Sequence, residues 1–212
     1  GKRVNIHTSN GVLPGVIGKK PIHLMDNKDR ETVVKLESQY IDIGAKDKKE
    51  AQKLVRVGDA VTFDSTFTRL HGDIVSSRGF DDKAGCFVVA EVLRLVKASG
   101  KKLNVDLYGV SSVQEEIGLR GGTTSCYTVN PDLGICVEVD FATDQPDVEK
   151  KHNGEVALGK GPVLARGANI NPRLFDLLCT AADDAKIAIQ HTASPRATGT
   201  DANVMQISRG GV

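Results

Sequence analysis

The sequence predicts an α/β protein in which a mixed sheet is covered by helices and is joined to a small β-barrel domain. Three observations predict this class. Short apolar runs broken by glycine and proline fill residues 1–62. From about residue 63, β-rich runs alternate with segments whose apolar residues recur at helical spacing. The chain has 212 residues, 40% of them hydrophobic, which is enough to bury a core.

Residues 1–62 are expected to form the β-barrel domain. Tyr40–Ile43 has the character of a strand, Asp47–Leu54 of a short helix, and Val57–Phe63 of a returning hairpin strand. A small domain of this kind makes a poor active site but a suitable lid or assembly surface. Glycines and prolines separate its apolar runs: Gly11, Pro14, Gly15, Gly18 and Pro21.

Residues 63–212 are expected to form the larger α/β domain. Asp81–Ala98 has an apolar stripe at helical spacing, and two acids in its first turn suit the helix dipole. Leu103–Val113 and Leu133–Val139 read as strands. Asn171–Pro172 is a typical helix start and precedes a second amphipathic segment.

Composition excludes several partners. The formal net charge of +1 favours neither nucleic acid nor an anionic membrane. No apolar run approaches the roughly 20 residues that span a bilayer, and no secretory signal opens the chain. The four cysteines are far apart and lack CxxC spacing, so we expect a buried, reduced set in a cytoplasmic protein: Cys86, Cys126, Cys136 and Cys179.

Acidic residues stand at the ends of several predicted elements. Asp81 begins a helix, Glu115–Glu116 follows one strand, and Asp140 follows another. An α/β sheet gathers such ends together, and clustered carboxylates repel unless a cation lies among them. Oxygen ligands suit Zn, Mn, Co or Mg, and a remaining glutamate could take a proton from metal-bound water. The alternative is a plain helix cap beside a solvated loop.

The glycines after the glutamate pair do not form a dinucleotide fingerprint, because acids rather than a G-x-G-x-x-G turn follow the strand. A close approach of the backbone explains Gly118, Gly121 and Gly122 better.

Several motifs in this order resemble the tetrahedral (TET) metallo-aminopeptidases of the co-catalytic zinc exopeptidase clan. The motifs are GVIGKKPIHL (Gly15–Leu24), DIGAKDKKEA (Asp42–Ala51), FDDKAG (Phe80–Gly85), VQEEIGLRGG (Val113–Gly122), VEVD (Val137–Asp140), LGKGP (Leu158–Pro162) and GTDA (Gly199–Ala202). The resemblance covers essentially the whole chain. It implies a zinc-exopeptidase-like sheet, with residues 1–62 as an inserted dimerisation or lid domain and residues 63–212 as the catalytic domain.

The resemblance also implies the roles of site residues. Asp81 would bridge two divalent metal ions, with zinc favoured over cobalt or manganese, and Asp82 would shape the backbone beside it. Glu115 would be the general base and acid, while Glu116 and Asp140 would each bind one metal. Thr200 and Asp201 would line the edge of the site.

A cytoplasmic aminopeptidase acting on short peptides is therefore expected, assembled as dimers into a dodecamer. The family's two histidine ligands have no counterpart at matching positions, and His71–Asp73 reads as a solvated turn. We therefore expect a fragment that lacks both ends, with both its domains incomplete, and that is nearly inactive alone. A carboxylate-pair glycosidase and a non-catalytic assembly fragment remain the alternatives.

Overall fold

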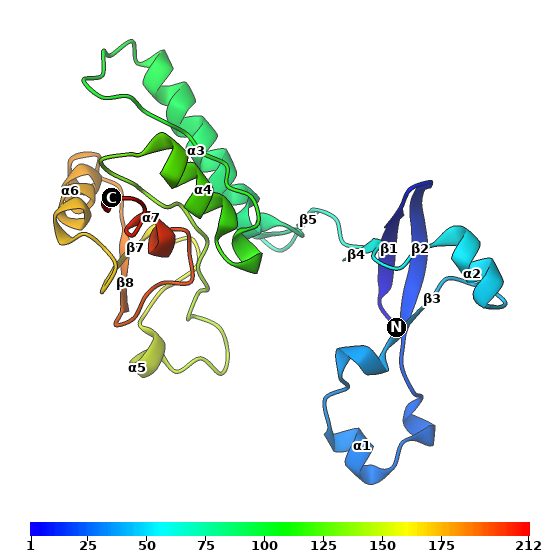
Figure 1. Ribbon diagram of the computed structural model, residues 1–212. Helices are drawn as coiled ribbons and strands as arrows, with labels where there is room; N and C mark the ends of the chain where they lie inside the picture. Colours follow the sequence, from blue (N-terminus) through cyan, green and yellow to red (C-terminus); the bar gives the residue numbers. More distant parts are fainter. The chain divides into compact units, whose positions relative to one another are not determined.

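The computed structural model describes residues 1–212, except for the side chains of residues 28 and 29. The chain divides into two compact units, Gly1–Arg78 and Gly79–Val212, and each is described by itself (Figure 1). The functional division at residues 62 and 63 remains a prediction.

The first unit is built on an antiparallel four-stranded sheet with the order β3-β2-β1-β4. The strands are β1 (Arg3–Thr8), β2 (Gly11–Gly18), β3 (Tyr40–Asp42) and β4 (Ala60–Phe63). Val4 is only 2% exposed and Ile6 is also buried, because alternate residues of the central strand face the same side. The sheet is open, and no closed barrel forms among the described residues.

A short helix, α2 (Lys48–Leu54), confirms the helix predicted in this unit. Its N-terminus is capped in both directions. The Asp47 carboxylate accepts a hydrogen bond from the Glu50 backbone N–H (2.9 Å), and the Glu50 carboxylate accepts one from the Lys46 N–H (2.7 Å). The other short elements are η1 (Ile22–Leu24), α1 (Asn27–Glu31), η2 (Leu36–Ser38), β5 (Thr68–Arg69) and β6 (Val75–Ser76).

The second unit combines helices with a parallel strand pair. Strands β7 (Val163–Gly167) and β8 (Gln190–Ser194) pair in parallel and are joined through α6 (Pro172–Asp184), which makes a βαβ unit. The Asn171 side chain accepts hydrogen bonds from the N–H groups at the start of α6, as predicted. The remaining elements are α3 (Phe80–Ala98), η3 (Glu115–Ile117), α4 (Arg120–Val129), α5 (Lys150–Asn153) and α7 (Ala202–Met205).

The α/β class and the helix at Asp81–Ala98 are confirmed, whereas two predicted strands are wrong. Residues 103–113 and 133–139 contain no assigned strand. A segment becomes a strand only where its backbone pairs with a neighbour. The structure pairs neither segment with another strand within the part of the chain it describes.

The apolar stripe of α3 follows the predicted spacing but is largely uncovered: Phe87 is 68% exposed and Leu95 is 53% exposed. All four cysteines are free, as expected. Burial was predicted for all four and is confirmed only for Cys126, since Cys136 and Cys179 are half-buried and Cys86 lies on an exposed part of α3. Among the described residues, no helix combines the length and apolar character needed to cross a membrane.

Candidate active site

The two neighbouring aspartates at the start of α3, Asp81 and Asp82, have different local roles. Both have non-helical backbone angles, and the peptide bond between them is cis. The Asp82 carboxylate accepts a hydrogen bond from the Gly85 N–H (2.6 Å) and so caps the helix. Gly85 is buried, and a side chain there would overlap that carboxylate. The capping role therefore falls to Asp82, and Asp81 lies just ahead of the cap.

Glu115 and Glu116 lie in the short 3₁₀ turn η3. Left-handed residues flank the turn: Gln114 has a φ of 58° and Leu119 a φ of 56°. The base of the turn is closed by a hydrogen bond from the Gly121 N–H to the Val113 carbonyl oxygen (2.8 Å). A side chain at position 121 would overlap the Val113 backbone, so the close approach predicted for this glycine is confirmed.

Asp201 lies against the same turn, although it is far away in the sequence. The Ser112 hydroxyl donates a hydrogen bond to Asp201 Oδ2. A side chain at Gly122 would overlap Asp201 Oδ1, which confirms close contact at this glycine also. The prediction is wrong for Gly118, which has open space around it and instead adopts a positive φ of 119°. Thr200 begins the turn into α7, where its carbonyl oxygen accepts from the Asn203 N–H (2.9 Å).

The electrostatics show which acids lie near one another. Burial raises the pKa of Glu115 most, and four carboxylates raise it further: Glu116, Asp201, Asp81 and Asp82. Burial also raises the pKa of Glu138, as do the charges of Asp82, Glu115 and Asp81, although the Val139 N–H lowers it. Acids from the start of α3, from η3 and from residue 138 therefore lie close enough for their charges to affect one another.

Asp140 behaves differently from the other predicted ligands. It is not among the main charges that raise the pKa of Glu115 or Glu138. Its carboxylate accepts a hydrogen bond from the Phe141 N–H (2.8 Å). Glu138, which lies two residues earlier, was not predicted from the sequence as a site residue. The available signal was the period of two, since alternate residues of an extended segment share a face.

The acids suit a divalent cation in donor type and in charge. Carboxylate oxygens are the ligands of hard and borderline ions, and mutual repulsion among them is what a cation would relieve. Their side chains do not converge: among the described residues, no group of three or more His, Cys, Asp and Glu side chains is arranged to hold a metal ion. The structure therefore shows the donors but not a closed ligand set.

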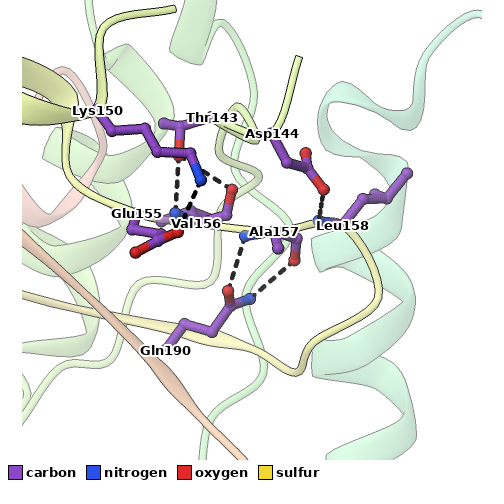
Figure 2. Close-up of polar contacts among 8 residues, drawn as sticks. All are labelled: Thr143, Asp144, Lys150, Glu155, Val156, Ala157, Leu158 and Gln190. Carbon is purple, nitrogen blue, oxygen red and sulfur yellow. Dashed lines mark hydrogen bonds and ion pairs between the residues drawn. The ribbon is translucent and has the colours of Figure 1, made fainter.

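The chain beyond Asp140 is held by polar contacts, which Figure 2 shows, and those between Thr143 and Val156 are buried. The Val156 N–H donates to the Thr143 hydroxyl (2.8 Å), and the Thr143 N–H donates to the Val156 carbonyl oxygen (2.7 Å). From β8, the Gln190 side chain accepts from the Ala157 N–H (2.8 Å) and donates to its carbonyl oxygen (3.1 Å). These contacts fix the segment that leaves the acidic site.

An α/β unit with several acids near one helix start suits the class of metal-dependent hydrolases. Residues 1–212 match the M42 glutamyl aminopeptidase family, and the chain belongs to that family. Members of this family depend on metal.

The comparisons with individual proteins agree. The chain is 38% identical over 213 residues to the lysyl aminopeptidase of Pyrococcus furiosus, covering all of this chain and 60% of that protein. The TET aminopeptidase of a marine sediment archaeon has a TM-score of 0.91 and 34% identity, with 100% of this chain and 60% of that one covered.

The Pyrococcus horikoshii TET1 peptidase has a TM-score of 0.74 and 33% identity, with 99% of this chain and 61% of that one covered. It is described as assembling into a tetrahedron or a large octahedral shell. This chain therefore spans about 60% of the length of these relatives.

Proposed function

We propose that the protein carrying this chain is a metal-dependent aminopeptidase that removes N-terminal residues from short peptides. Membership of the M42 family and the aminopeptidase names of its relatives support this activity. The observation that carries the proposal is the position of Glu115, whose pKa is raised first by burial and then by the charges of the other acids around it. A carboxyl group with a raised pKa holds an accepted proton more firmly than an ordinary carboxylate does, which suits a group that accepts and then returns a proton.

Each acid then has a distinct part. Glu115 takes the proton from the attacking water and passes it to the leaving amine. Asp81, Glu116 and Asp140 are the proposed ligands of two divalent ions, with zinc favoured over cobalt or manganese. Such ions would supply Lewis acidity at the scissile carbonyl. Glu138 is an alternative to Asp140 for the ligand role, because its pKa is raised by burial and by the charges of Asp82, Glu115 and Asp81.

The activity is tested by turnover of aminoacyl-nitroanilides with chelator and with restored zinc, cobalt or manganese. Glu115→Gln should lower kcat by about 10²–10⁴-fold, because it removes the proton acceptor. Its metal content should match that of the wild type. The control is Glu37→Gln, an exposed glutamate of the first unit. Activity that survives chelation, or turnover of glycans instead of peptides, would contradict the proposal.

The ligand assignment needs a measurement other than activity. Glu138→Gln and Asp140→Asn are compared by bound metal per chain after dialysis against a defined zinc concentration. Glu116→Gln is the reference for the loss of a proposed ligand. If Asp140 is a ligand, Asp140→Asn loses metal as Glu116→Gln does. If only Glu138→Gln loses metal, the third ligand is Glu138.

We further propose that the open sheet of the first unit joins two copies, that the dimers assemble into a dodecamer, and that the enzyme is cytoplasmic. Relatives that form tetrahedral or octahedral shells support the assembly, and four free cysteines support the location. Light scattering on the purified full-length protein tests the assembly. A monomer at micromolar concentration would contradict it. Stable assembly without any peptidase turnover would favour a non-catalytic assembly role.

A further inference from the structure

Asp201 touches both limbs of the turn that carries Glu115 and Glu116. On the entering limb, the Ser112 hydroxyl donates a hydrogen bond to Asp201 Oδ2. On the leaving limb, Oδ1 lies against the backbone of Gly122, so closely that any side chain there would overlap it. Between these two contacts, the Gly121 N–H donates to the Val113 carbonyl oxygen and closes the turn. One carboxylate therefore spans the base of the turn.

The cost of this placement points to a role. Asp201 Oδ1 is buried and has no hydrogen-bond partner among the described residues. Most buried polar atoms are paired, so an unpaired carboxylate oxygen calls for an explanation. The tight packing against Gly122 accounts for its position but offers it no donor, since the contact is with the α-carbon side of a glycine.

Asp201 is not needed to hold the C-terminal part of the unit in place. Helix α7 packs against α4, and the Arg209 guanidinium lies 4.0 Å from the centre of the Tyr127 ring. The Arg209 Nε–H also donates to the Tyr127 carbonyl oxygen (2.6 Å). These contacts anchor the segment separately, so removing the Asp201 carboxylate should loosen the turn without releasing α7.

We propose that Asp201 is a positioning residue, which clamps the two limbs of the Glu115 turn through Ser112 and Gly122 and so fixes where Glu115 and Glu116 point. This inference rests on the proposed peptidase function for its kinetic consequence. The clamp itself is a statement about the turn and can be measured without turnover.

The kinetic test compares Asp201→Ala, Asp201→Asn and Ser112→Ala in the full-length protein. Misplacing a reacting group by about 1 Å can cost about 10²-fold, so Asp201→Ala should lower kcat by about 30–100-fold. KM should change by less than about threefold, because the clamp does not touch the substrate. Asparagine can still accept from Ser112, so Asp201→Asn should recover most of the lost kcat. The exposed Asp184→Ala on α6 is the matched control.

Hydrogen exchange supplies the second readout. Asp201→Ala should speed exchange in residues 112–122, and most at the Gly121 N–H, while α6 keeps its wild-type protection. Ser112→Ala should do the same. Asp201→Ala and Ser112→Ala both remove the Ser112–Asp201 hydrogen bond. The double variant should therefore exchange no faster than the faster of the two single variants.

The outcomes separate the two hypotheses. Unchanged exchange in residues 112–122 of Asp201→Ala would overturn the clamp. The clamp would also be overturned if Asp201→Asn had a kcat as low as that of Asp201→Ala together with a raised KM. The negative charge of Asp201 would then act on the substrate directly. A wild-type protein without peptidase activity whose exchange still follows the predicted pattern would refute only the proposed function.

Discussion

Replacing Thr143 by valine tests how the segment beyond the acidic site is held. Thr143 is 2% exposed and its hydroxyl makes two hydrogen bonds with Val156, which is 6% exposed. It accepts from the Val156 N–H at 2.8 Å and donates to the Val156 carbonyl oxygen at 3.1 Å. Valine has nearly the same shape, so the change removes these bonds without opening a cavity.

The size of the effect follows from what each lost bond leaves behind. The Val156 carbonyl oxygen keeps the hydrogen bond from the Thr143 N–H, so this loss costs about 0.5–1.5 kcal/mol. The Val156 N–H keeps no partner among the described contacts, and an unpaired buried donor costs about 1–3 kcal/mol. Together, Thr143→Val should lower the free energy of unfolding by about 1.5–4.5 kcal/mol.

Urea unfolding of the full-length protein, followed by circular dichroism, measures this difference through the midpoint at constant m-value. The matched control is Thr180→Val on α6, where an exposed hydroxyl donates only to the Asp176 carbonyl oxygen (2.9 Å). That change should cost less than about 0.5 kcal/mol. Equal midpoints for the two variants would refute the reasoning.

Three further predictions address the turn and its surroundings. In chelator-treated protein, Glu115→Gln should melt higher than wild type at pH 7. The raised pKa of Glu115 means that its ionised form destabilises the folded protein. The difference in melting temperature should therefore vanish below pH 4.5, the ordinary pKa of a glutamate, as thermal melts from pH 4 to 8 would show. Gly121→Ala should lower the free energy of unfolding, measured by urea, by about 1–3 kcal/mol, because its side chain would meet the Val113 backbone. Gly210→Ala, which has open space, should not. Gln190→Leu should destabilise by about 1–3 kcal/mol through its lost backbone bonds, and more than the exposed Gln145→Leu in the same assay.

Local signals predicted the elements that depend on local interactions. The helix starts at Asp47 and Asn171 were visible in sequence because a cap and its backbone N–H partners lie within a few residues. The helix α3 was predicted equally well, because its apolar residues recur at helical spacing. The strands at residues 103–113 and 133–139 were not predicted correctly, since a strand needs pairing with a neighbour, which no run of apolar residues guarantees.

The candidate site was predictable only in part for the same reason. The paired acids at Asp81 and Glu115 were found because each pair lies at a boundary of a predicted element. Glu138 and the contact of Asp201 with Ser112 were missed, because both depend on approach between residues distant in sequence. The family resemblance placed Asp201 near the site, but only the structure shows which atoms it touches.

The backbone of the Glu115 turn favours a functional reading over a plain surface loop. Gln114 and Leu119 adopt left-handed angles that non-glycine residues avoid, at about 1–2 kcal/mol each. The same turn contains Gly121, whose lack of a side chain is required by the Val113 backbone. It also carries two carboxylates near four others, where neutral side chains would be more stable. Local strain and unbalanced charge thus coincide on Glu115 and Glu116. A loop free of functional demands would relax both, and a cation among these acids would relieve the charge while leaving the strained backbone to aim them.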